Sequence, residues 1–220
     1  MSFLSSSTKA GRLVLLARLF LAVLIPAHSA LVIAESKVDR PTASLQTAVF
    51  AGGCFWGVDA VFKHVKGVAS VESGYAGGNA DSASYGAVSG GRTGHAEAVR
   101  VRFNPAQVSY QQLLQVFFFV AHDPTQLNRQ GPDVGRQYRS AIFFTDPEQH
   151  KTATDQIKKL TAERTFGKPV VTQIAALQQF YPAEPYHQNY LARHLTQPYI
   201  VINDLPKIEH LRRQFPDLYQ

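Results

Sequence analysis

The stretch "TAVFAGGCFWGVDAVF", residues 47–62, decides how the fold begins. Its first half is a short apolar run that ends in two glycines, which is typical of a buried strand followed by a tight turn. Its second half predicts a helix, because apolar residues recur at helical spacing from residue 55 onward. The members of that apolar face are Phe55, Val58, Val61, Phe62 and Val65. The only cysteine of the chain, Cys54, lies at the junction between strand and helix.

The rest of the chain alternates between strand and helix patterns. Strands are predicted at 68–78, 96–103, 139–144 and within 168–180, and helices at 104–122 and 145–166, with shorter helices after 181 and in the tail. Asp146 and Pro147 begin the second long helix as N-cap and first-turn proline. Residues 79–95 and 123–138 are rich in turn formers and predict long loops. This order predicts an α/β fold (an α+β plait): one two-layer sandwich domain with a mixed sheet and a ferredoxin-like core.

The N-terminus has the pattern of an export signal. Residues 1–12 are polar and basic, an apolar run follows, and "AHS" and "VIA" offer small residues for cleavage after Ser29 or Ala34. An uncleaved anchor and an organellar transit peptide are the alternatives. We therefore expect a signal peptide or anchor at 1–34, a linker at 35–46, a catalytic domain at 47–220, and a periplasmic or extracytoplasmic location. Without residues 1–34, 19 basic residues stand against 16 acidic ones, too small an excess to indicate nucleic acid.

Cys54 has two readings. A free cysteine is more often a buried core residue than a reactive one. At the first turn of a helix, however, unpaired N–H groups and the helix dipole favour thiolate, so the sequence predicts a lowered pKa for Cys54. Phe55 and Trp56 follow directly and point in different directions, so at least one of them is expected to line a cavity beside the sulfur.

Glu97 also has two readings. An alternating strand "AEAVRVRF" places it on the same face as Val99, Val101 and Phe103. It is either a solvated residue at the strand end, or a carboxyl held against an apolar face. In the second case its pKa would be raised, and it would be a candidate general acid.

Other polar residues are weaker candidates on their own. Most tyrosines merely pack, and Asp133 in "GPDVG" has a turn role by default. A histidine paired with Cys54 would make a cysteine hydrolase or acyltransferase, and a Phe-Trp pocket without catalysis would make a peptide-binding module. The residues concerned are Tyr75, Tyr85 and Tyr138 among the phenols, and His95, His122 and His187 among the imidazoles.

Five separated blocks resemble one family. "GGCFWG", "SGYAGG", "TGHAEAV", "HDPTQLNRQGPDVGRQYRSAIFF" and "YPAEPYHQNYL" occur in the order found in the A-type peptide methionine sulfoxide reductases. The resemblance runs from Thr47 to Tyr199. It implies reduction of the S epimer of methionine sulfoxide, protein-bound and free, in the repair of oxidised proteins.

The resemblance also implies roles for single residues. Cys54 would be the nucleophile that becomes a sulfenic acid, and Glu97 the general acid. Tyr85 and Tyr138 would orient the sulfoxide oxygen, and Asp133 would help to place the polar end of the site. Phe55 and Trp56 would form the pocket for the substrate's methyl group.

The recycling step departs from the better-known members of that family. They carry resolving cysteines near the C-terminus, whereas this chain has Cys54 alone. An external thiol must therefore reset the enzyme: a thioredoxin-like protein, glutaredoxin with glutathione, or a small dithiol. No bound cofactor or metal is expected, and a monomer is the default, since no feature argues for an oligomer.

Overall fold

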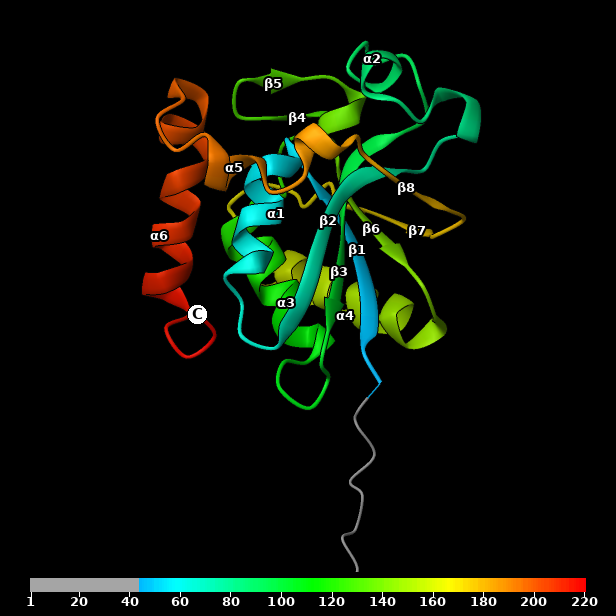
Figure 1. Cartoon of the computed structure of the whole chain (residues 1–220). Coiled ribbons are helices and arrows are strands. Elements are labelled where there is room, and N and C mark those ends of the chain that lie inside the picture. The colour runs from blue at the N-terminus through cyan, green and yellow to red at the C-terminus, as the bar shows by residue number, and fades with distance from the viewer. Residues whose placement is uncertain (1–43) are drawn as a thin grey trace, which may run out of the picture. The chain divides into compact units, whose positions relative to one another are not determined.

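The centre of the fold is strand β1, Gln46–Gly52, which is buried from Ala48 onward. The computed structural model describes residues 44–220 (Figure 1). The predicted export segment and most of the predicted linker lie outside these residues. Strand β1 pairs antiparallel with β3, Ala96–Phe103, on one side and with β6, Ser140–Phe144, on the other.

The main sheet has six strands in the order β7-β6-β1-β3-β2-β8. Strand β2 (Val68–Ala76) lies between β3 and β8, and β7 (Gln173–Ala176) and β8 (Phe180–Pro182) are the edge strands. The four strands β6-β1-β3-β2 are antiparallel, and the helices α1 (Phe55–Lys63) and α3 (Tyr110–Val116) connect them in a ferredoxin-like arrangement. Because β7 adds in parallel to β6, the sheet is mixed. The predicted fold class is therefore confirmed.

Helices cover one face of this sheet. Apolar residues of α1, α3 and α4 (Pro147–Ala162) share one buried cluster with the inward-facing side chains of β1, β3 and β6. Alternation along β3 places Val99, Val101 and Phe103 in this cluster, as the sequence predicted. The opposite face carries mostly alanines, packed under Phe143 and Phe180. The helices form one layer and the sheet forms the other, which gives the two-layer sandwich that the order of elements predicted.

The helix ends follow their sequence signals. Asp146 caps α4 by accepting a hydrogen bond from the backbone N–H of Gln149 at 2.8 Å, and Pro147 follows it. Ser109 and Gln112 form a capping box at the start of α3. The predicted helix over 104–122 is shorter than expected, and it continues from Val116 into a π-helical turn, Phe117–Ala121.

The two predicted loops contain short elements of their own. Residues 79–95 include α2, Tyr85–Val88, and residues 123–138 include a hairpin of β4 (Arg129–Gln130) with β5 (Asp133–Val134). The C-terminal part forms α5 (Tyr190–Arg193), a π-helical segment Ile200–Asp204, and α6 (Leu205–Gln214). Figure 1 shows α5 and the β4–β5 hairpin near the same end of α1. Over residues 44–220, no helix combines the length and apolar character needed to cross a membrane.

Candidate active site

Cys54 lies at the N-cap of α1, directly after the turn that ends β1. Gly53 makes this turn with φ +95°, and a Cβ there would come within 2.6 Å of the Gln130 side chain. The thiol is only 8% exposed. Gly53 thus lets the backbone approach the β4–β5 hairpin closely and holds the sulfur at the end of a core strand.

Glu97 lies beside Cys54 in a nearly water-free setting. It is 2% exposed, pairs with Tyr75 across β2 and β3, and accepts a hydrogen bond from the backbone N–H of Phe55 at 3.1 Å. Burial raises the pKa of Glu97 to about 8, and the charge of Asp133 adds to the rise, while the Phe55 bond opposes it. Of the two readings of Glu97, the structure supports the carboxyl held against an apolar face. At neutral pH this group carries a proton.

The sequence predicted a lowered pKa for Cys54, and the structure contradicts this prediction. Burial raises the pKa of the Cys54 thiol well above its ordinary value, and Glu97 and then Asp204 add to this. A hydrogen bond with the backbone of Trp56 and the charge of Lys207 act in the opposite direction. The helix start does favour thiolate, as the sequence indicated, but the desolvation of the sulfur outweighs it. The resting cysteine is a neutral thiol.

The phenol groups of Tyr85 and Tyr138 lie close enough to Glu97 and Cys54 to interact with them electrostatically. Burial raises the pKa of Tyr85 and of Tyr138, and for both Glu97 and Cys54 raise it further once they are ionised at high pH. Tyr85 is the first residue of α2, and Tyr138 ends the short helix Arg136–Tyr138 before β6. In the described part of the chain, neither hydroxyl has a hydrogen-bond partner. Both hydroxyls are therefore free to bind a ligand oxygen.

The aromatic pair after Cys54 divides between core and surface. Phe55 is 1% exposed and packs on Tyr75 and His187, with ring centroids 5.9 and 5.1 Å away. Trp56 is half-buried and stacks on Tyr190 at 3.7 Å, and its indole N–H donates to Nδ1 of His187 at 3.1 Å. Phe55 is thus a core residue and Trp56 is held by its stack and its hydrogen bond, but neither side chain is among those that line the cavity at Cys54.

A cavity of about 120 Å³ opens at Cys54. Asp133 lies in it, as predicted, and accepts a hydrogen bond from the Tyr199 hydroxyl at 2.5 Å. The remaining walls come from the β4–β5 hairpin and the C-terminal part of the chain: Gln130, Gly131, Pro132, Tyr199, Asn203 and Lys207. Sequence reasoning missed this C-terminal wall, since no local motif joins residues 199–207 to residue 54.

Asp204 supports this wall from behind. Its carboxylate is fully buried and pairs with Lys207 at 3.1 Å. Gly57 makes room for this pair, because a Cβ there would lie 2.1 Å from Oδ1 of Asp204. The pKa of Asp204 is raised by burial, and Lys207 opposes the rise.

The histidines have partners other than Cys54. His95 bonds to the carbonyl of Asn79 at 2.9 Å, His122 bonds to the carbonyl of Phe117 and to Ser140, and His187 accepts from Trp56. None of these rings forms a hydrogen bond with the sulfur in the described residues. The arrangement gives no Cys-His pair, which removes the structural basis of the hydrolase alternative.

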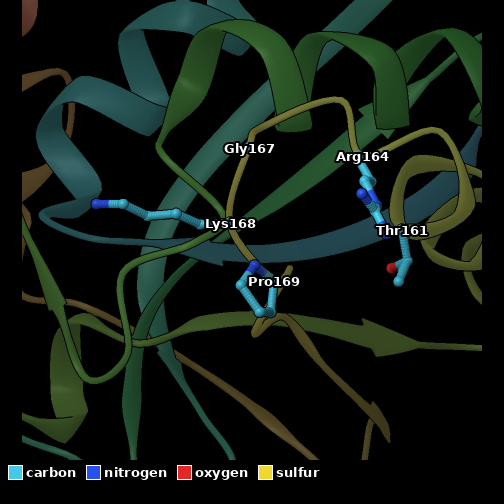
Figure 2. A pocket seen from close by; sticks show the side chains of 5 residues that line it. All are labelled: Thr161, Arg164, Gly167, Lys168 and Pro169. Atoms are coloured by element: carbon cyan, nitrogen blue, oxygen red, sulfur yellow. The ribbon is translucent and has the colours of Figure 1, made fainter.

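A larger hollow lies elsewhere and lacks this chemistry. A pocket of about 290 Å³ follows α4 and is lined by Thr161, Arg164, Gly167, Lys168 and Pro169 (Figure 2). Figure 2 shows the Lys168 side chain extending away from Arg164, so the two cations do not converge on one ligand. We therefore take the smaller cavity at Cys54 as the candidate active site.

A family comparison and a comparison with individual proteins identify the same family. Residues 46–218 match the family described as peptide methionine sulfoxide reductase. The chain is 55% identical over 181 residues to "Peptide methionine sulfoxide reductase MsrA 2" of Mesorhizobium japonicum, a match that covers 82% of this chain and 93% of the relative. It is 50% identical to the MsrA of Deinococcus radiodurans over 183 residues, which cover 83% of this chain and 88% of the relative.

Two solved structures are similar over most of the described domain. Reduced Mxr1 from Saccharomyces cerevisiae matches with a TM-score of 0.65 and 32% identity, covering 70% of this chain and 88% of that chain. Methionine sulfoxide reductase A of Corynebacterium diphtheriae matches with a TM-score of 0.62 and 33% identity, covering 72% and 78%.

Proposed function

The chain belongs to the peptide methionine sulfoxide reductase family, and on this premise we propose that it reduces the S epimer of methionine sulfoxide with Cys54 as the nucleophile. One observation carries the proposal. A carboxyl with a pKa of about 8, Glu97, is bonded to the first backbone N–H after the only cysteine. Such a group still holds its proton at neutral pH, beside the cysteine that attacks the substrate.

The chemistry needs such an acid. Cys54 Sγ attacks the sulfoxide sulfur, and the S–O bond breaks only when the oxygen is protonated, which is the role we give Glu97. The oxygen then passes from the methionine sulfur to Sγ: an O–Sγ bond forms as the Sγ–S and S–O bonds to the methionine sulfur break, so methionine leaves and Cys54 becomes a sulfenic acid. Protons balance, because Glu97 gives its proton to the oxygen, which keeps it in the sulfenic acid, and takes up the proton that the Cys54 thiol loses.

The surrounding side chains fit substrate orientation. The free hydroxyls of Tyr85 and Tyr138 would donate to the sulfoxide oxygen, and Asp133, held by Tyr199, would fix the polar side of the site. Trp56, with Phe55 behind it, would contact the methyl group. An acid and a methyl site at fixed positions around the sulfur distinguish the two sulfoxide epimers.

Resetting requires a thiol from outside, because the chain has no second cysteine. One thiol condenses with the sulfenic acid to give a mixed disulfide and water, and a second thiol then releases Cys54. We propose a dedicated extracytoplasmic donor: a thioredoxin-like protein distinct from cytosolic thioredoxin, glutaredoxin with glutathione, or a small dithiol. Turnover with dithiothreitol should exceed turnover with a cytosolic thioredoxin system, and efficient turnover with thioredoxin alone at ordinary concentrations would count against this route.

The export pattern of residues 1–34 supports a periplasmic or extracytoplasmic site of action, with a dedicated reductant there. N-terminal sequencing of the protein from fractionated cells tests this. A mature chain that starts after Ser29 or Ala34 is expected, whereas an intact N-terminus in the cytosolic fraction would contradict it.

The activity itself is tested with an oxidised peptide. Methionine-S-sulfoxide peptide and dithiothreitol should yield reduced methionine, and the R epimer should not. Cys54→Ser should abolish turnover and Glu97→Gln should slow it, while Glu209→Gln, at an exposed site on α6, serves as control. Unchanged activity in Cys54→Ser would refute the assignment.

A further inference from the structure

Glu184 joins two segments that are far apart in sequence, and one of them carries a proposed active-site hydroxyl. Its Oε1 accepts a hydrogen bond from the backbone N–H of Tyr85 at 2.9 Å. Its Oε2 accepts one from the Tyr75 hydroxyl at 2.8 Å. Both oxygens of this carboxylate thus accept a hydrogen bond, one from a residue of strand β2 and the other from the first residue of α2.

The segment that carries Tyr85 has little packing of its own. Helix α2 has four residues, of which only Val88 is buried. Ser84, at the N-cap, makes no side-chain capping bond. Glu184 supplies the missing acceptor from 99 residues away. A second tie, from Gln137 to the carbonyl of Ser89, fixes the other end.

Glu184 itself projects from a rigid base. Strand β8 pairs with β2 directly before it, and the next residues are clamped to β2 as well. The N–H of Ala183 donates to the Ser73 carbonyl at 2.9 Å, and the Gln188 side chain bonds to both backbone groups of Ser73. The position of the carboxylate is therefore set by the sheet, and the position of Tyr85 follows from it.

We infer that Glu184 is a positioning residue for sulfoxide reduction, which acts by fixing Tyr85 at the site. The inference rests on the proposed function, in which the Tyr85 hydroxyl orients the sulfoxide oxygen. Glu184 forms no hydrogen bond with Cys54 or Glu97 in the described residues, so its effect on the first chemical step is assigned to its bond with Tyr85. It has no part in the later reaction of the sulfenic acid with thiols.

The test separates the two steps of the cycle. Rapid mixing of enzyme with a methionine-S-sulfoxide peptide, without thiol, gives the rate of the methionine burst. Glu184→Ala should slow this burst about tenfold, because a hydrogen bond to a charged acceptor is lost and the hydroxyl loses its fixed position. The rate at which dithiothreitol reduces the preformed sulfenic acid should not change. An unchanged burst, or an equal loss in both steps, would overturn the inference.

Matched variants identify the path of the effect. In a Tyr85→Phe background, Glu184→Ala should add less than about twofold, whereas independent action would multiply the two losses. Tyr75→Phe removes only the other bond of the same carboxylate and should cost less than about threefold. Glu184→Gln keeps one acceptor for the Tyr85 N–H and should restore most of the rate. If Glu184→Ala does not fold, Glu184→Asp should show the same loss, because it is one methylene too short to hold both partners.

A second readout does not depend on the activity. Amide hydrogen exchange at residues 79–95 should be about tenfold faster in Glu184→Ala than in the wild type, and no faster at 97–103 in β3. Equal exchange in the two proteins would overturn the inference even if the proposed function holds. Faster exchange together with no methionine burst from the wild type would instead reject the function and leave the anchoring intact.

Discussion

Glu97→Gln should make the protein more stable and less active, and the gain in stability should grow with pH. The wild-type carboxyl has a pKa of about 8 in the folded state and about its ordinary value, 4.5, in the unfolded state. Between these values the folded state binds the extra proton, so stability falls as pH rises. Glutamine has no such titration, and it can still accept the bond from the Phe55 N–H.

The magnitude follows from the two pKa values. Stability is lost at up to about 1.4 kcal/mol per pH unit between the two pKa values and more slowly near each of them, so Glu97 alone accounts for a loss of about 3.5 kcal/mol between pH 5 and pH 8. Since Glu97 is 2% exposed, solvent screening reduces this little. Burial also raises the pKa of Asp59, to about 6. Asp59 titrates in both proteins, so its contribution to stability cancels in the difference between them.

The assay is urea unfolding of both proteins at pH 5, 6.5 and 8, in dithiothreitol. The variant should gain about 3 to 4 kcal/mol relative to the wild type from pH 5 to pH 8. The matched control is Glu72→Gln, which removes a carboxyl from the same sheet at a more exposed position, where it pairs with Arg100, and so reports the effect of the Glu-to-Gln change outside the site. A stability difference between Glu97→Gln and the wild type that stays constant with pH would refute the buried, protonated state of Glu97.

Three further predictions address the rest of the site. Tyr138→Phe should slow the methionine burst about 10- to 100-fold at unchanged stability, as expected for loss of a donor to a developing charge; a burst at the wild-type rate would exclude it from oxygen binding. His187→Phe removes the acceptor of the Trp56 indole N–H. It should therefore alter the fluorescence emission of Trp56, the only tryptophan, and raise the KM about fivefold, whereas an unchanged spectrum would contradict the hydrogen bond. Gly57→Ala should cost about 2 to 3 kcal/mol in urea unfolding, since its Cβ would lie 2.1 Å from Asp204, and wild-type stability would show that the pair can move.

The elements that the sequence predicted correctly have strong local signals. The strand, double glycine and helix around Cys54 appear as β1, the turn at Gly53 and α1. The capping pair Asp146-Pro147 begins α4 at the predicted position. Alternation along β3 also placed Glu97 on the face that turned out to be buried. Periodicity, caps and turns depend on neighbouring residues, so they can be read from the sequence.

The features that sequence reasoning missed depend on contacts between distant segments. The wall of Tyr199 and Lys207 beside Cys54 arises only because the C-terminal part of the chain packs against the start of α1. The direction of the Cys54 pKa shift was wrong for the same reason. The helix start is visible in the sequence, whereas the burial that outweighs it comes from packing.

The most direct test of the central claim is a single turnover without any thiol. The wild-type protein, first reduced and freed of reductant, is mixed with excess methionine-S-sulfoxide peptide, and methionine and the state of Cys54 are measured together. We expect one methionine per protein, with a sulfenic acid on Cys54 that a dimedone-type reagent traps, and neither product in Cys54→Ser. Methionine formation without oxidation of Cys54, or no methionine at all, would contradict the account.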